Sequence, residues 1–134
     1  YSRHVVSWEL SITMDVDFCM TALKKALFIA KPEIFNSDQG SQFTSSRFTD
    51  ILKENNVKIS MDGKGRVYDN IFVERLWRTV KYEEIFLKEY NSVWDLRSSL
   101  TRFFEFYNND RPHSSLGNKT PAEVYFERRE KQAG

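Results

Sequence analysis

The chain has 134 residues, enough to bury one hydrophobic core but not two. Hydrophobic residues make up 40% and charged residues 29%, and the net charge is +1, so any surface for a polyanion must come from local placement of charge. A single cysteine, Cys19, excludes an internal disulfide, and with His4 and His113 it fits no zinc-site spacing. No apolar run approaches the roughly 20 residues of a membrane span and no signal segment opens the chain, so we expect a reduced, cytosolic, soluble protein.

The first half of the sequence predicts alternating strands and helices. Residues 4–10 read as a strand after a turn formed by residues 1–3, and we expect the natural fold to begin upstream of Tyr1. Apolar residues at helical spacing predict a helix over 15–30, which Pro32 ends. Its apolar stripe includes Cys19, which we interpret as a core residue.

Two shorter strands and a helix follow. Residues 33–36 predict a buried strand, and a helix capped by Ser45 or Ser46 should run to Lys53. Residues 57–61 alternate as a strand. Residues 62–69 contain two glycines beside two basic residues and therefore predict a flexible basic loop.

The second half predicts only helices. We expect them over 70–87, over 92–108 and from Pro121 onward, the last capped by Thr120. The aromatics of RFFEFYNN recur at helical spacing and are expected in the core, as is Trp94. Strands alternating with helices and then helices alone predict an α/β protein whose strands are covered on both sides.

The loop RPHSSLG, residues 111–117, allows two interpretations. It is either a basic turn near DNA or a partner subunit, or a structural cap that docks the final helix, with His113 as an ordinary hydrogen-bonded histidine. We prefer the structural interpretation.

Two carboxylates raise the question of function. Asp38 follows a predicted strand in SDQGSQFTSS and is either part of a surface turn or a metal ligand. Glu74 shares a helical stripe with Arg78 and Lys81, which alone would favour a solvated face with an i,i+4 ion pair between Glu74 and Arg78. On the same helix a second stripe is predicted to be core: Val73, Leu76, Trp77 and Val80.

Together these motifs resemble a known family. SDQGSQFTS, the Gly/Lys loop, YDNIFVERLWRTVK and the tail FYNNDRPHSSLGNKTPAEVYF are similar to the catalytic core of retroviral-integrase-like transposases, closest to those of bacterial insertion sequences of the third family. The resemblance covers residues 1–126 and leaves 127–134 as a C-terminal tail. It implies a ribonuclease H-like fold, with a mixed sheet of strand order 3-2-1-4-5 flanked by helices.

The resemblance also implies a chemistry. Family members cut and join DNA with two Mg²⁺ (or Mn²⁺) ions, which take oxygen ligands. Asp38 and Glu74 would be the catalytic metal ligands. Contacts to DNA are implied for Gln42, Lys64, Arg66, Arg78 and Lys81. The implied partners are insertion-sequence ends, target DNA and further copies of the chain, in the bacterial cytoplasm at the nucleoid.

One part of the family pattern has no counterpart here. The family site has three carboxylates, and the first aspartate and the first two strands of the sheet find no match; Asp15 and Asp17 do not correspond to that position. We therefore expect an N-terminally truncated core that is inactive alone and whose open strand edges favour association. The alternatives are an active strand-transfer enzyme and a non-catalytic module, derived from a transposase, that binds DNA, associates with itself or regulates the intact enzyme.

Overall fold

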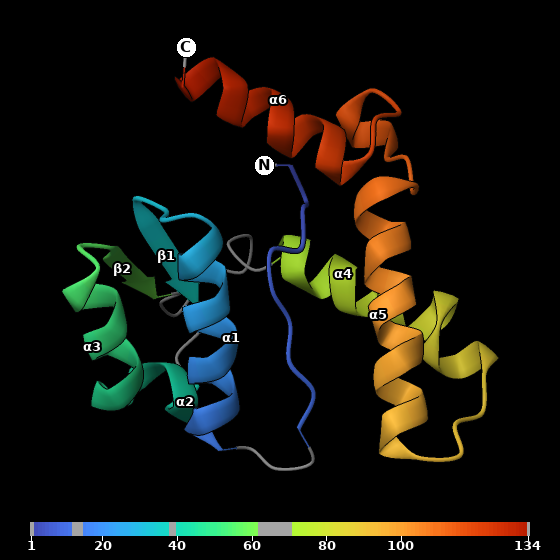
Figure 1. The fold of residues 1–134 in the computed structure, drawn as a ribbon, viewed down its shortest axis with the longest axis horizontal. Helices are drawn as coiled ribbons and strands as arrows, with labels where there is room; N and C mark the ends of the chain where they lie inside the picture. The colour runs from blue at the N-terminus through green and yellow to red at the C-terminus, as the bar shows by residue number, and fades with distance from the viewer. Residues whose placement is uncertain (1, 12–14, 38–39, 62–70, 134) are drawn as a thin grey trace. The chain divides into compact units, whose positions relative to one another are not determined.

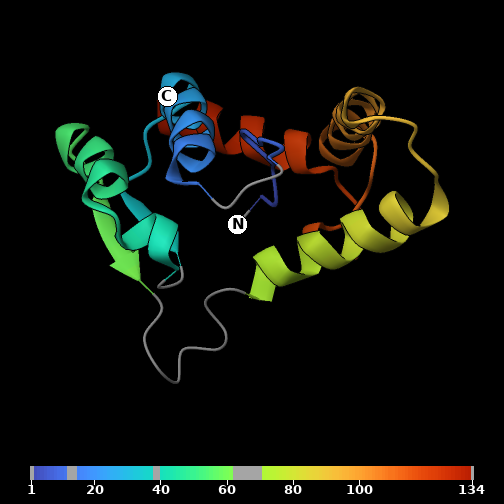
Figure 2. The same ribbon diagram turned by 90° about the horizontal axis from the view of Figure 1, so that it is seen from below.

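The computed structural model describes residues 2–11, 15–37, 40–61 and 71–133. The chain divides into two compact units, which we describe separately (Figures 1 and 2). One unit is Val6–Arg75, and the other combines Tyr1–Val5 with Leu76–Gly134.

The unit Val6–Arg75 contains a parallel pair of strands and three helices. The strands are β1 (Ile34–Ser37) and β2 (Lys58–Met61), with Ile34 opposite Lys58. Parallel strands need a crossover connection, which α2 (Ser41–Thr44) and α3 (Ser46–Glu54) provide, and α1 (Val16–Ile29) packs against both helices. Figure 1 shows the three helices gathered beside the strands.

This unit is held together by an apolar core between α1 and α3. Its buried members come from both helices and from the residue before β2: Leu23, Leu27, Phe48, Leu52 and Val57. The Phe48 ring contacts the rings of Phe35 and Phe43, with centroids 5.7 and 5.4 Å apart. Cys19 borders this core, and burial raises the pKa of its thiol, in agreement with the predicted packing role.

The second unit is helical. It contains the greater part of α4 (Ile71–Glu83), the short 3-10 helices η2 (Ile85–Leu87) and η3 (Ser114–Leu116), and the helices α5 (Val93–Asn109) and α6 (Pro121–Ala133). Figures 1 and 2 both show α6 starting beside the C-terminal end of α5. The boundary predicted after residue 126 falls inside α6 and stays a prediction.

The sequence predicts caps at Thr120 and at Ser45 or Ser46, and the structure shows a further one at Ser92. Ser92 caps α5 by accepting a hydrogen bond from the Asp95 N–H at 3.0 Å. Thr120 and Glu123 form a reciprocal capping box at α6, with distances of 3.2 and 3.1 Å. At α3, Ser45 is the N-cap residue, but its side chain accepts no capping hydrogen bond.

The α/β class and most elements are confirmed, but the strand predicted over residues 4–10 is wrong. Residues 2–11 form no strand, and the sheet among the described residues consists of β1 and β2 alone. The Asn108 side chain instead satisfies the main chain at Val5: its Oδ1 accepts from the Val5 N–H at 2.8 Å and its Nδ2 donates to the Val5 carbonyl at 2.9 Å. An amide side chain thus occupies both groups that a neighbouring strand would pair.

Three predicted core assignments are also corrected. Val73 and Trp77 on α4 are 48% and 52% exposed, and Trp94 at the start of α5 is 77% exposed. On α4 only Val80 is buried, so the buried side of the helix is narrower than the apolar stripe of its sequence. The aromatic core predicted for α5 is confirmed at three positions, Phe103, Phe104 and Tyr107, whereas Phe106 is 45% exposed.

The helix predicted over 70–87 is shorter than expected, because Glu84 leaves helical backbone geometry (φ −130°, ψ −66°) and η2 follows. Beyond α5, the RPHSSLG loop contains the hydrogen-bonded His113 that the structural interpretation expects, while docking of the final helix by this loop stays a prediction. Arg111 forms two hydrogen bonds to the Glu83 carboxylate, at 2.9 and 3.0 Å, and a third to Nε2 of His113 at 3.3 Å. Gly117 has a φ of +65°, in the left-handed region that favours glycine.

No helix in the described part of the chain is both long and apolar enough to cross a membrane.

A core substitution tests whether the α1–α3 interface holds its unit together. Leu52→Ala should lower the free energy of unfolding by about 2–5 kcal/mol, because Leu52 is fully buried and alanine leaves a cavity. Urea denaturation followed by circular dichroism measures the loss. The matched control is Lys53→Ala, at the next, exposed position of the same helix, which should change stability by less than about 0.5 kcal/mol. Equal effects of the two substitutions would contradict this assignment of the core.

Candidate functional site

The carboxylate of Glu74 lies in the first turn of α4 and is exposed. An acidic group at this end of a helix is favoured by the helix dipole. Among the described residues it forms no ion pair and no side-chain hydrogen bond. The i,i+4 pair with Arg78, which the helix alone would favour, does not form: the Arg78 guanidinium lies over the Tyr82 ring instead, 5.8 Å from its centroid.

Arg78 and Lys81 follow Glu74 along one stripe of α4, and both are exposed. At 3.6 residues per turn, the three side chains fall within an arc of about 60°. The nearest acidic group along the helix beyond Lys81 is Glu83, which is already bound by Arg111. The stripe thus presents one free carboxylate and two cations without described acidic partners.

The other predicted site residues are only partly within the described chain. Asp38, Lys64 and Arg66 lie outside the described residues; β1 ends at Ser37, the residue before Asp38 in the sequence. Gln42 is half-buried on α2. Gly40, the N-cap of α2, has a φ of −58°, so the left-handed region is not the reason for glycine there.

Within the described residues, no group of three or more His, Cys, Asp or Glu side chains is placed to hold a metal ion. The donor set expected from the sequence, Asp38 and Glu74, supplies carboxylate oxygens, which are the ligands that Mg²⁺ takes. The exposed carboxylate of Glu74 fits this chemistry because no described cation neutralises it.

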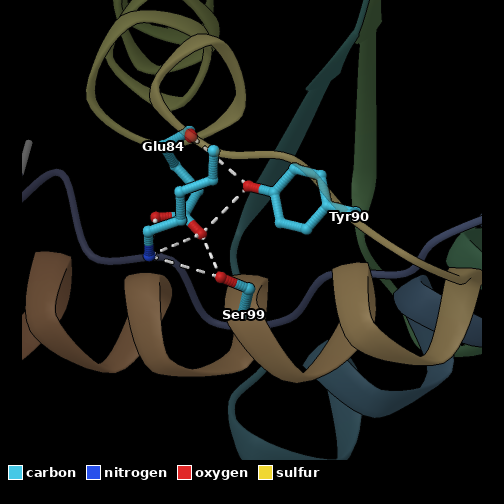
Figure 3. Close-up of polar contacts among 4 residues, drawn as sticks. Glu84, Tyr90 and Ser99 are labelled. Atoms are coloured by element: carbon cyan, nitrogen blue, oxygen red, sulfur yellow. Dashed lines mark hydrogen bonds and ion pairs between the residues drawn. The ribbon is translucent and has the colours of Figure 1, made fainter.

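A buried carboxylate that the sequence analysis missed lies at the end of α4. Glu84 is 3% exposed and receives hydrogen bonds from Ser99 Oγ, from Tyr90 Oη at 3.1 Å and from Lys88 Nζ at 3.0 Å (Figure 3). Tyr90 Oη also donates to the Glu84 carbonyl at 3.3 Å. Figure 3 shows Tyr90 and Ser99 both pointing toward the Glu84 carboxylate.

This cluster fastens the C-terminal end of α4 to α5, because Ser99 belongs to α5 and Glu84 directly follows α4. Burial alone would raise the pKa of Glu84, but the hydrogen bonds from Ser99, Lys88 and Tyr90 and the charge of Lys88 outweigh it and lower the pKa. The i,i+4 spacing of Glu84 and Lys88 was visible in the sequence. The convergence of Tyr90 and Ser99 was not, because it depends on how the chain turns between α4 and α5.

The lowered pKa predicts how stability depends on pH. Above the ordinary pKa of a glutamate in the unfolded chain, 4.5, the ionised Glu84 stabilises the fold, and this contribution should be lost as pH falls through the lower folded-state value. Glu84→Gln should cost about 1–3 kcal/mol at pH 7 and flatten the acid limb of the stability–pH curve. Urea titrations from pH 7 to pH 3 measure both effects.

The control for this experiment is Glu89→Gln, at an exposed position in the same connection. It should leave stability and its pH dependence nearly unchanged. An acid limb that keeps its slope in Glu84→Gln would show that other groups carry the dependence.

Comparison with protein families covers residues 1–121. Two models described as "Integrase core domain" match it, one over residues 1–67 and the other over residues 55–121. Together they span α1 to the start of α6 and include Glu74, Arg78 and Lys81.

Curated relatives point the same way. The chain is 32% identical over 126 residues to "Putative transposase InsK for insertion sequence element IS150" of Escherichia coli (strain K12), covering 92% of this chain and 44% of that protein. It is 32% identical over 125 residues to "Transposase for insertion sequence element IS904" of Lactococcus lactis subsp. lactis (strain IL1403), covering 90% and 49%. The chain thus spans about half the length of the curated relatives it matches.

Solved structures agree on the fold. The catalytic core domain of BIV integrase aligns with a TM-score of 0.74 at 17% identity, covering 94% of this chain and 80% of that one. The HTLV-2 integrase catalytic core domain, described in complex with magnesium in a trimeric form, aligns with a TM-score of 0.69 at 20% identity, covering 88% and 74%. These likenesses confirm the expected ribonuclease H-like fold. By its family matches, the chain belongs to the integrase core domain family and resembles the transposases of bacterial insertion sequences.

Proposed function

We propose that this chain provides part of the catalytic core of a transposase that cuts insertion-sequence ends and joins them to target DNA. The observation that carries the proposal is the free carboxylate of Glu74 on one stripe of α4 with Arg78 and Lys81, in a chain of the integrase core domain family. A carboxylate with nearby cations suits phosphodiester chemistry, since the acid can hold a metal ion and the cations can hold phosphates.

Each residue has a role in this proposal. Asp38 and Glu74 would hold Mg²⁺ or Mn²⁺, and a pair of such ions, when bound, would activate the attacking oxygen and stabilise the leaving oxygen. Arg78 and Lys81 would bind phosphates of the DNA. Gln42, Lys64 and Arg66 are proposed as further DNA contacts. The magnesium in the HTLV-2 integrase core supports the choice of metal.

The proposed partners follow from the same chemistry. Substrate DNA would place the protein in the bacterial cytoplasm at the nucleoid. The trimeric form of the HTLV-2 core supports assembly with further copies of the chain. Because the family site has three carboxylates and these 134 residues match two of them, we propose that the chain does not cleave DNA by itself.

The DNA-binding role of α4 gives the first test. Lys81→Gln should weaken binding of duplex DNA about 3- to 10-fold and reduce the slope of log affinity against log salt by about 1, because one phosphate contact is lost. Fluorescence anisotropy over a salt series measures both. The control is Lys131→Gln near the end of α6, which should change neither. A wild-type chain that binds no duplex even at low salt would contradict the proposal.

Cleavage gives the second test. The 134-residue chain should not nick insertion-sequence end DNA with Mg²⁺ or Mn²⁺, and Glu74→Gln should be indistinguishable from it in a gel assay with end-labelled DNA. Nicking that Glu74→Gln lowers by at least about 100-fold would show an enzyme active as it stands, and would confirm the role of Glu74 while refuting the inactivity. Nicking unaffected by Glu74→Gln would contradict the assigned site.

A further inference from the structure

The indole of Trp77 is the largest side chain on α4 and is half exposed, at 52%. It forms no side-chain hydrogen bond and no ring contact with any described residue. Tryptophan is highly buried on average, and an exposed one is typical of binding surfaces. Trp77 therefore calls for an explanation other than packing within its unit.

The position of Trp77 on the helix relates it to the candidate site. It lies three residues after Glu74 and four before Lys81, so that at 3.6 residues per turn the three side chains share an arc of about 60°. The buried Val80 lies on the other flank of Trp77. The indole thus borders the stripe that carries the free carboxylate and the free lysine.

Aromatic rings also lie beside a cation on the other flank of this stripe. The Arg78 guanidinium lies 5.8 Å from the ring centroid of Tyr82, and Tyr82 meets Phe86 edge to face at 5.4 Å. Tyr82 and Phe86 are 61% and 64% exposed. Aromatic rings beside cations are the combination that binds single-stranded nucleic acid, with the rings stacking on bases and the cations neutralising phosphates.

The charges decide between possible occupants. An apolar protein surface would cover Trp77 but would strip water from Arg78 and Lys81 without offering them acidic partners. A fully paired duplex would satisfy the cations, but its bases are stacked on one another and offer no free face to an indole. DNA with an unpaired base supplies both a phosphate and an aromatic face.

We propose that Trp77 stacks on an unpaired base of the DNA held by α4, next to Glu74. This deepens the proposed function and rests on it. The stacked base would fix the position of the adjoining phosphodiester relative to Glu74, while Arg78 and Lys81 bind its phosphates.

An overhang with and without bases tests the proposal while the phosphate charge stays constant. The probes are a duplex with a short overhang of unpaired thymidines, the same duplex with an abasic overhang, and a blunt duplex. Trp77→Ala should weaken binding of the thymidine overhang by about 5- to 150-fold and leave the other two nearly unchanged. Trp77→Phe should retain most of the affinity. The matched control is Trp94→Ala, which removes a more exposed indole (77%) from α5 and should have no effect.

A second readout does not depend on the alanine variant folding. In the double variant Trp8→Phe/Trp94→Phe, Trp77 is the only tryptophan, and its fluorescence should be quenched by the thymidine overhang but not by the abasic one. Equal loss of affinity for all three probes in Trp77→Ala, or no base-dependent quenching, would overturn the stacking proposal. If the stacking proposal fails but the wild-type chain still binds the blunt duplex through Lys81, the proposed function stands without base stacking. A wild-type chain that binds none of the three probes overturns both the stacking proposal and the proposed function.

Discussion

The buried carboxylate of Glu84 is the interaction on which the second half of the molecule depends. Removing a charged carboxylate from water costs several kcal/mol unless hydrogen bonds and an opposite charge replace the lost hydration. Ser99, Tyr90 and Lys88 supply that replacement. Because these donors come from α5 and from the connection before it, the carboxylate is satisfied only when α4 ends where it does and the chain turns back along α5. The Arg111–Glu83 ion pair also holds the C-terminal end of α4, with Arg111 following the C-terminal end of α5.

This anchoring explains how α4 can present a mostly exposed surface. Only Val80 is fully buried on it, so apolar packing alone gives the helix a narrow attachment. The polar cluster at Glu84 fixes its C-terminal end. The other sides of α4 therefore do not need apolar residues to hold the helix in place. They can carry the exposed side chains of Glu74, Trp77, Arg78 and Lys81.

The elements that depend on local pattern were predictable from the sequence. Apolar residues at helical spacing located α1, α3 and α5 within one or two residues, and Thr120 with Pro121 marked the start of α6. The strand over 4–10 failed because a strand is defined by its neighbour, and at Val5 the side chain of Asn108, far away in sequence, pairs with the main chain instead. Trp77 was assigned to the core because helical periodicity identifies a face but not its width.

In the candidate site, too, features set by local sequence were predictable and features set by contacts between distant residues were not. The residue types and order that suggested metal ions and DNA are local motifs, and they identified Glu74, Arg78 and Lys81 on one stripe. Whether Glu74 was free or paired with Arg78 could not follow from spacing, since i,i+4 allows either; the Tyr82 ring competes for the guanidinium. The Glu84 cluster escaped notice because its donors are brought together only by the turn between α4 and α5.

The placement of charge explains how a chain with a net charge of only +1 could bind a polyanion such as DNA. Pairing removes one charge of each sign, so the net charge of +1 is unaffected by it. Glu9, Asp17, Glu83, Glu84 and Glu127 are each paired with a lysine or arginine, and in four of these pairs neither partner lies on α4. Arg78 and Lys81 have no described acidic partner: Glu74, four residues before Arg78, does not pair with it, and Glu83, two residues after Lys81, is held by Arg111. A protein with almost no net charge can in this way expose a locally cationic helix. Charges separated by more than about 10 Å are screened from one another at 0.1 M salt. An approaching DNA strand would therefore respond to the local charge of α4 rather than to the net charge of the chain.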